Sequence, residues 1–204
     1  MKTWNIAAVG AATLALGIPL AISVGEPDAA QSTTPAGGGP SEGGLTREMF
    51  TEDSTAPRVQ PAQYDLTIVK YTDYQCPYCR QAHAALQQLL AEDDRIRIIY
   101  RDWPVFGAPS VTAARLAIAS KWQGKHAQFH DALMRTTGRL SDASIRAAAD
   151  RAGVDWGRLQ RDLQAHAAEI DALLARNSQQ AAQLGLQGTP GFIIGTYLIP
   201  GGMD

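Results

Sequence analysis

Two short runs of the chain place apolar side chains on both faces of an extended backbone. The first is DLTIVKYT at residues 65–72, in which Leu66 and Ile68 share one face and Val69 lies on the other. The second is RIRIIYR at residues 95–101. Two-sided burial is typical of central strands that helices cover. Lys70 is the exception, because its ammonium group falls on the Leu66/Ile68 face.

Between these strands the apolar positions change to a helical period, which predicts a helix over about residues 77–92. Asp93 and Asp94 end this helix. The side chains that share one helical face are Ala82, Ala85, Leu86, Leu89 and Leu90. Strand, tight turn, helix and strand together predict one βαβ unit.

The helical pattern then continues through residues 109–184 before strand character returns in FIIGTYLI at 192–199, with a two-residue turn at Gly195-Thr196. Four helices are predicted there: one around Ala114 to Trp122, one around Phe129 to Met134, one capped by Ser141 that ends near Gly153, and a long one capped by Asp155 that ends at Gly185. The sequence therefore predicts an α/β domain with a helical insertion at about 109–185.

The first 44 residues differ from this domain. Residues 1–25 carry one cation, Lys2, followed by an apolar run, as in a secretory signal peptide or a membrane anchor. Residues 26–44 are rich in Gly, Pro, Ser and Thr, which predicts a flexible linker. We therefore expect export, with cleavage or anchoring left open, and a folded domain over residues 45–204.

Overall composition narrows the class of protein. Hydrophobic residues make up 45 % and charged residues 19 %, which is typical of a globular domain. The formal net charge is −2 and no basic run stands out. This charge balance gives no basis for nucleic-acid binding, which depends on clustered Lys and Arg.

The candidate chemistry lies in TDYQCPYCRQAH, which holds the only two cysteines, Cys76 and Cys79. Pro77 favours the first helical position, which places Cys76 at the N-cap and Cys79 one turn inside the helix. The helix dipole and free N–H groups should lower the pKa of Cys76 from about 8.5 to roughly 3.5–7.5. We expect Cys76 to be exposed and reactive and Cys79 to lie behind it as a thiol.

Two other interpretations of the cysteines remain. A structural disulfide across so short a loop would restrain the unfolded chain little. A zinc site generally needs four ligands, so it would have to recruit histidines. The histidines are His83, His126, His130 and His166, of which His126 and His130 are one helical turn apart and His83 is expected on the helix surface near the active site.

A second signal is GTPGF at residues 188–192, where Pro190 enters the last strands. This X-Pro bond is a candidate cis peptide, although only about 5–6 % of such bonds are cis.

These features together resemble the DsbA-like branch of the thioredoxin superfamily, over residues from about 47 to 204. The motifs that carry the resemblance are TDYQCPYC, FHDALM at 129–134, GTPGFIIG at 188–195 and the helical insertion. The resemblance implies a thioredoxin fold with a Cys76–Cys79 redox disulfide, Cys76 attacking and Cys79 resolving. It also implies a cis-proline at Pro190, a substrate contact at Thr189, and tuning by the intervening Pro77 and Tyr78.

The sequence departs from the family pattern at two places. Relatives often have a carboxylate six residues before the first cysteine, where this chain has Lys70, which could lower a thiol pKa or extend to water. The family also has a helix after the last hairpin, whereas PGGMD ends where it would begin. We therefore expect the C-terminus to be truncated and one sheet face to be incompletely covered.

The sequence thus predicts an exported, monomeric, cofactor-free enzyme of the periplasm or another extracytoplasmic space. It would form disulfides in exported proteins that contain cysteines and be reoxidised by a quinone-linked membrane partner, as the resemblance implies. A reductase or isomerase of the same fold, kept reduced by an electron-donating membrane protein, is the nearest alternative. A metal-binding envelope protein using Cys76, Cys79 and a histidine is the alternative from another class.

Overall fold

The computed structural model describes residues 46–201. The elements in chain order are α1 (Arg47–Thr51), β1 (Arg58–Val59), β2 (Leu66–Thr72), α2 (Pro77–Glu92), β3 (Ile96–Asp102), α3 (Ala108–Ala119), the 3-10 helix η1 (Ser120–Gln123), α4 (His126–Met134), α5 (Asp142–Arg151), α6 (Trp156–Ala165), α7 (Ala167–Gln183), β4 (Gly191–Ile194) and β5 (Tyr197–Pro200). The predicted leader and linker lie outside the described residues. None of the helices within residues 46–201 combines the length and apolar character that a bilayer crossing needs.

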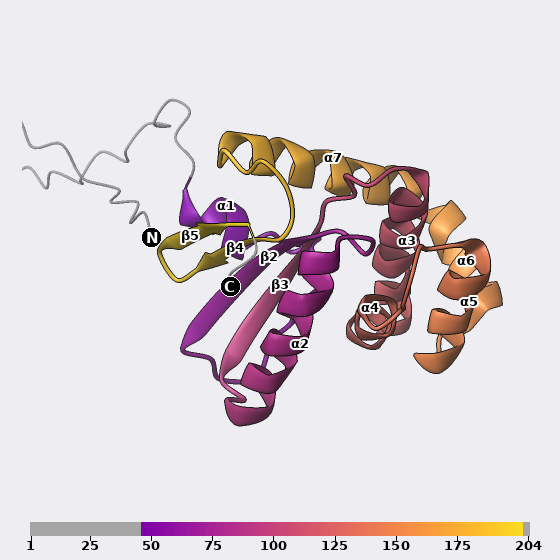
Figure 1. Cartoon of the computed structure of the whole chain (residues 1–204), viewed down its shortest axis with the longest axis horizontal. Coiled ribbons are helices and arrows are strands. Elements are labelled where there is room, and N and C mark those ends of the chain that lie inside the picture. Colours follow the sequence, from indigo (N-terminus) through magenta and orange to yellow (C-terminus); the bar gives the residue numbers. More distant parts are fainter. Residues whose placement is uncertain (1–45, 202–204) are drawn as a thin grey trace, which may run out of the picture. The chain divides into compact units, whose positions relative to one another are not determined.

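The five strands form one mixed sheet in the order β1-β3-β2-β4-β5. β2 and β3 are parallel, and their register places Lys70 beside Tyr100 and Thr72 beside Asp102. β4 runs antiparallel to β2, with Tyr71 opposite Gly191. The C-terminal end of β2 therefore lies beside the start of β4, at the edge where α2 begins (Figure 1).

Helices cover both faces of the sheet, as the two-sided apolar strands predicted. On one face Ile68 and Ile98 pack with Leu86 of α2. On the other, Val69 and Ile99 belong to the larger core, to which α1, α3 and α7 contribute. At the margins of the α2 face Leu66, Ile194 and Ile199 are partly buried.

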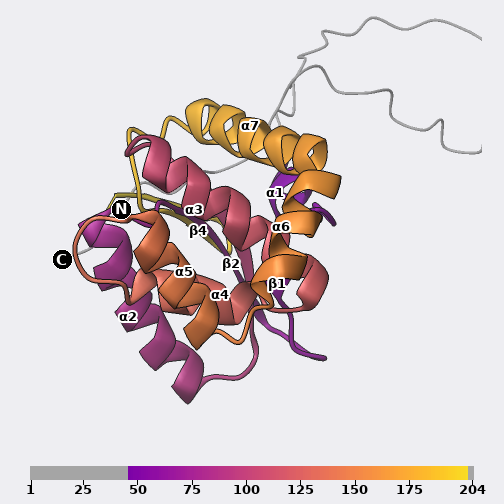
Figure 2. The same cartoon turned by 90° about the vertical axis from the view of Figure 1, so that its right-hand side faces the viewer.

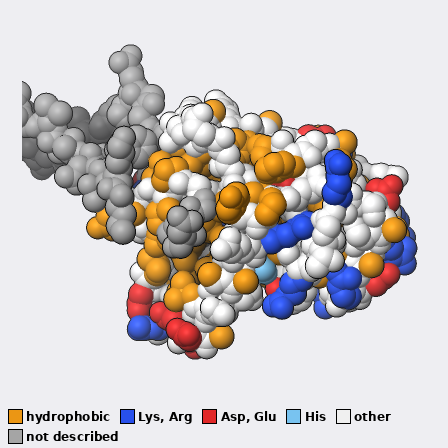
Figure 3. Space-filling model, viewed as in Figure 1, with side chains coloured by type: hydrophobic (Ala, Val, Ile, Leu, Met, Phe, Trp, Pro, Cys, Tyr) orange, Lys and Arg blue, Asp and Glu red, His pale blue; other side chains and the backbone are white. Residues whose placement is uncertain are grey.

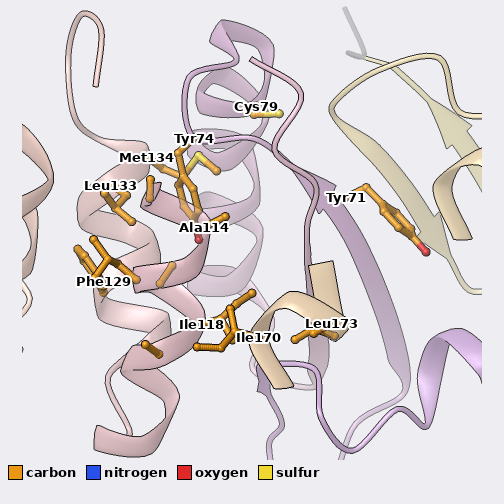
Figure 4. Close-up of a cluster of buried hydrophobic side chains, with 14 of the residues drawn as sticks. Tyr71, Tyr74, Cys79, Ala114, Ile118, Phe129, Leu133, Met134, Ile170 and Leu173 are labelled. Carbon is orange, nitrogen blue, oxygen red and sulfur yellow. The ribbon is translucent and has the colours of Figure 1, made fainter. Parts of the chain in front are cut away.

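The helical insertion lies between β3 and β4, as predicted. α3 contacts α4, α6 and α7, and α5 packs on α4 (Figure 2). Close up, Phe129 and Leu133 of α4 lie near Ala114 and Ile118 of α3 (Figure 4). The helices of the insertion thus have their own apolar core, which continues into the core above the sheet.

Two helix N-caps in the insertion are confirmed and one helix differs. Ser141 caps α5 and Asp155 caps α6, each accepting a hydrogen bond from a backbone N–H of the first turn. Gly185 takes a positive φ of 72° after α7. The predicted long fourth helix is in fact two, α6 and α7, which meet at His166, because the φ of His166 (−114°) is not helical.

The start of the domain and the buried side of α2 also differ from the prediction. The segment 45–63 contains α1 and β1, which are too short to show a period in the sequence. The buried positions of α2 are Cys79, His83 and Leu86, whereas Leu89 is 40 % exposed. Ala82, Leu86 and Leu90 pack on the sheet as predicted, whereas Ala85 and Leu89 are exposed, because the buried side also includes a cysteine and a histidine that apolar periodicity does not mark.

Candidate active site

The two cysteines sit at the start of α2 as predicted, Cys76 at the N-cap with Pro77 following it. Cys79, one turn on, is fully buried, and both cysteines are free thiols. The expectation that Cys76 is exposed is wrong, because the residue is only 1 % exposed. Tyr78 between the cysteines is 61 % exposed and is the accessible side chain of the motif.

The loop before β4 lies against the first cysteine. Thr189–Pro190 is a cis peptide bond, as predicted. In its thiol form Cys76 donates a hydrogen bond from Sγ to the carbonyl oxygen of Thr189 at 3.2 Å. The pairing of β4 with β2 brings these segments together although 113 residues separate them along the chain. The contact accounts for part of the burial of Cys76.

The two thiols have opposite acidities. A hydrogen bond from the Cys79 thiol lowers the pKa of Cys76 to about 6; burial opposes this shift, and the backbone N–H groups of Cys79 and Tyr78 support it. Burial raises the pKa of Cys79 well above its usual range, and its hydrogen bond to Cys76 raises it further. At neutral pH the pair therefore consists of a thiolate at Cys76 and a thiol at Cys79.

Asp73 holds the loop in front of the cysteines in place, and sequence reasoning did not single it out. Its carboxylate accepts hydrogen bonds from the backbone N–H groups of Gln75, Val105 and Phe106 and from the Ser110 hydroxyl, all at 2.7–3.0 Å. It thereby joins the β2–α2 turn to the β3–α3 loop. An aspartate that begins a turn was the available signal.

Exposed apolar side chains accompany this loop. One is Tyr78 in the motif. The others are Val105, Phe106 and Val111, whose side chains are 38–51 % exposed. Figure 3 shows hydrophobic side chains gathered over the middle of the face that carries α2, with Lys and Arg mainly toward the helical insertion.

Lys70 does not extend to water, which excludes one of the two interpretations of this residue. Its side chain is fully buried under α2, and its Nζ has no hydrogen-bond partner among the described residues. Asp102, at the end of β3, is 1 % exposed and was not anticipated as part of the site. The only signal for Asp102 was its place at the end of a strand that neighbours β2.

Three histidines line the same interior. The expectation of a surface position for His83 is wrong, since it is 3 % exposed and bonds Asp131 at 2.9 Å. His130 bonds the Tyr74 hydroxyl at 2.9 Å and lies 5.8 Å, ring to ring, from His126. Within residues 46–201 no cluster of His, Cys, Asp and Glu has the arrangement of a metal site.

The profile of the DSBA-like thioredoxin domain covers residues 67–204, which include both cysteines, the insertion and the cis-proline loop.

Solved structures agree in fold. A thioredoxin-like oxidoreductase from Silicibacter pomeroyi DSS-3 has 38 % identity and a TM-score of 0.73, covering 78 % of this chain and 91 % of that one. The thiol-disulfide exchange protein alpha-DsbA2 from Wolbachia pipientis has 28 % identity and a TM-score of 0.72, covering 77 % and 84 %.

The curated relatives are much longer proteins. Na(+)/H(+) antiporter NhaA 1 of Salinispora arenicola is 30 % identical over 136 residues, which are 66 % of this chain and 21 % of the relative. NhaA 3 of Salinispora tropica is 29 % identical over a segment of the same size. The matched segment thus spans about a fifth of the length of the curated relatives.

Proposed function

The chain belongs to the DSBA-like thioredoxin domain family, and we propose that it forms disulfides in exported proteins. The family fold and the buried cysteine pair make this chain a thiol–disulfide oxidoreductase. The direction of exchange rests on the placement of the two cysteines: Cys76 lies at the start of α2, where the Cys79 thiol and backbone N–H groups lower its pKa to about 6, whereas Cys79 is fully buried, which raises its pKa. A stabilised thiolate favours the reduced form of the pair, and a pair whose reduced form is favoured is a good oxidant.

The reaction begins from the Cys76–Cys79 disulfide. A substrate thiolate attacks the Cys76 Sγ, the bond between the two cysteines breaks, and the electron pair goes to the Cys79 Sγ. The second substrate thiolate then attacks the substrate sulfur of the mixed disulfide, and Cys76 leaves as a thiolate. The low pKa of Cys76 makes it a good leaving group in this last step.

The Thr189 carbonyl and the apolar side chains near the cysteines suit a peptide substrate. An extended peptide could hydrogen-bond to backbone of the cis-proline loop and place apolar side chains against Tyr78 and Phe106. We propose that the substrates are exported proteins containing cysteines and that a quinone-linked membrane protein reoxidises the pair. An extracytoplasmic location follows from this reaction, because disulfides persist in oxidising compartments.

The reduction potential tests the direction of exchange. Equilibration with glutathione should give a potential more oxidising than the value of about −270 mV that is typical of thioredoxin. A potential at or below that value contradicts the oxidase proposal. Faster rearrangement of scrambled ribonuclease than oxidation of reduced ribonuclease would favour an isomerase.

Two serine variants test the roles of the cysteines. Cys76→Ser should abolish exchange, because the nucleophile and leaving group with the low pKa is lost. In Cys79→Ser the Cys76 thiolate can still attack the disulfide of an oxidised substrate, and the mixed disulfide should accumulate on non-reducing gels, because Cys79 is no longer there to displace the substrate from Cys76. The chain has no other cysteine, so both results are free of competing thiols. Mixed disulfides on Cys79 in the Cys76→Ser variant would reverse the assignment.

A further inference from the structure

A lysine lies in the interior beside the redox pair. Lys70 is on β2, between Tyr100 of β3 and Phe192 of β4, and its side chain has no solvent exposure. Its Nζ makes no hydrogen bond to any described residue. A buried ammonium group without hydrogen bonds is unfavourable unless opposite charge lies nearby.

The groups around Lys70 come from four parts of the chain. They are Cys79 and His83 on α2, Tyr100 and Asp102 on β3, His126 and His130 on α4, and Tyr74 in the turn before α2. Burial lowers the pKa of Lys70 to about 8, while the neighbouring Cys79 and Asp102 act in the opposite direction. Burial and the Lys70 charge lower the pKa of His83 and His130, so both rings are neutral near pH 7.

Asp102 is a buried carboxyl group of the same interior. It is 1 % exposed, neither of its oxygens has a hydrogen-bond partner among residues 46–201, and its Oδ2 lies 3.8 Å from the His126 Nε2. Asp102 favours the charged form of Lys70 but offsets only part of the effect of burial. Opening of the disulfide adds a further negative charge at Cys79, next to the same ammonium group.

Building on the proposed function, we propose that Lys70 is the internal cation that accepts the negative charge of Cys79 during exchange. When a substrate thiolate bonds to the Cys76 Sγ, the Cys76–Cys79 bond breaks and its electron pair goes to the Cys79 Sγ. The Lys70 ammonium offsets this charge through the water-poor interior until Cys79 takes up a proton from solvent and becomes a thiol. In the reverse direction Cys79 releases its proton to solvent and attacks Cys76, while the ammonium again offsets the charge on Sγ.

This arrangement matters because Cys79 is buried. A thiolate in a water-poor interior is strongly disfavoured, and burial raises the pKa of this thiol. A positive charge nearby acts strongly there, since the local dielectric constant is low. Lys70 therefore lowers the barrier for each step in which Cys79 carries charge, whereas Cys76 is stabilised by the hydrogen bond from the Cys79 thiol and by backbone N–H groups at the start of α2.

The reaction of the reduced protein with DTNB separates the two cysteines. Cys76 attacks DTNB and releases one thionitrobenzoate, at a rate that depends on the DTNB concentration. Cys79 then attacks the mixed disulfide at Cys76 and releases the second, at a rate independent of DTNB concentration. Stopped-flow absorbance across pH 5–10 gives a pH profile for each phase.

Lys70→Met should slow the second phase at pH 7 by roughly 10-fold or more. This is equivalent to raising the midpoint of the pH profile of the second-phase rate by about one pH unit. The first phase should be nearly unchanged. Asp102→Asn should shift the second phase in the opposite direction, to lower pH, because it removes negative charge near Cys79. Lys125→Met is the matched control, since it makes the same charge change at a half-exposed side chain.

The outcomes distinguish this inference from the proposed function. An unchanged second-phase profile in a folded Lys70→Met variant overturns the role of Lys70, and equal slowing of both phases indicates only a structural role. If Lys70→Met does not fold, the Asp102→Asn variant decides. A second-phase pH profile of Asp102→Asn that is unchanged or that moves to higher pH overturns the proposed role of Lys70. Failure of the unmodified protein to show a second phase would instead overturn the exchange activity itself.

Discussion

At the scale of single residues, the chemistry depends on burial more than on residue type. Cys76 and Cys79 are the same residue one helical turn apart, yet hydrogen bonding lowers the pKa of Cys76 while burial raises that of Cys79. Lys70 shows the same effect on a cation, because burial lowers its pKa to about 8. Only the shift of Cys76 crosses neutral pH, so Cys76 is a thiolate there while Cys79 stays a thiol and Lys70 stays charged.

The burial of Lys70 predicts that Lys70→Met stabilises the reduced protein at pH 7. The folded pKa is about 8 and the ordinary value is 10.5. Because the pKa of Lys70 is lower in the folded protein, the unfolded chain binds more protons between these two pH values. The destabilisation caused by the buried Lys70 charge is therefore full below about pH 8 and disappears as pH rises toward 10.5. The gain should be about 3 kcal/mol at pH 7.

Urea unfolding of both proteins under reducing conditions, at intervals from pH 6 to 10, measures this difference. The difference in the free energy of unfolding between Lys70→Met and the parent should be constant below about pH 7 and should shrink above pH 8. A variant that is less stable than the parent at pH 7, or a gap that widens with pH, would show that Lys70 is held by stronger contacts than the structure contains.

At the scale of elements, α5 and α6 begin with a side-chain cap, whereas α2 does not. Ser141 and Ser144 form a reciprocal cap at α5, in which each backbone N–H donates to the other serine hydroxyl. At α2 the N-cap residue is Cys76, whose side chain makes no capping bond to the backbone and bonds Thr189 instead. The first turn of α2 is therefore left to stabilise a thiolate rather than to be closed by a cap.

Removal of the α5 cap should have a modest and local effect. Ser141→Ala should lower the free energy of unfolding by about 1 kcal/mol, because one N–H of the first turn loses its acceptor. Ser178→Ala, at an exposed position within α7, is the control and should be neutral or slightly stabilising. Urea midpoints that do not differ between the two variants would contradict the cap.

At the scale of the whole molecule, a buried ionic network joins the start of the domain to the sheet and to α7. Asp53 lies 2.6 Å from Arg101 of β3 and 3.1 Å from Arg176 of α7. Arg101 is fully buried and also donates to the carbonyl oxygen of Phe50 and to Asn177. This network fixes the face of the sheet opposite α2, and thereby the strands that carry Lys70 and the cysteine turn.

Asp53→Asn should be strongly destabilising, by about 3 kcal/mol, because Arg101 keeps its buried charge without a carboxylate. Burial alone would raise the pKa of Asp53, but hydrogen bonds from Thr55 and Arg101 and the Arg101 charge lower it well below 3.8. The stability that the ionised Asp53 carboxylate contributes is therefore present above about pH 4 and is lost as pH falls further.

Urea unfolding from pH 2 to 7 tests this prediction, since the acid-dependent loss should be smaller in Asp53→Asn than in the parent. Asp171→Asn is the matched control, because its ion pair with Arg115 is partly exposed. That variant should change the free energy of unfolding by less than about 1 kcal/mol. Equal losses in the two variants would contradict a special role for Asp53.

The sequence by itself determined the features that rest on local periodicity and backbone chemistry. The β2–α2–β3 unit, the insertion, the hairpin, the caps at Ser141 and Asp155 and the place of Cys76 at a helix start all follow from apolar spacing, Pro and Gly. The resemblance to the family also predicted that the Thr189-Pro190-Gly191 loop lies beside the CPYC motif.

Only the tertiary structure decided which of these side chains are buried and what lies next to them. Cys76 is covered by a loop 113 residues away, His83 turns inward to Asp131, and Lys70 is enclosed with Asp102 and Cys79. Such burial depends on strand register and on helices from distant parts of the chain, which no local pattern encodes. Because burial sets the free energy of a charge, the structure rather than the motif determines the acidity of this pair.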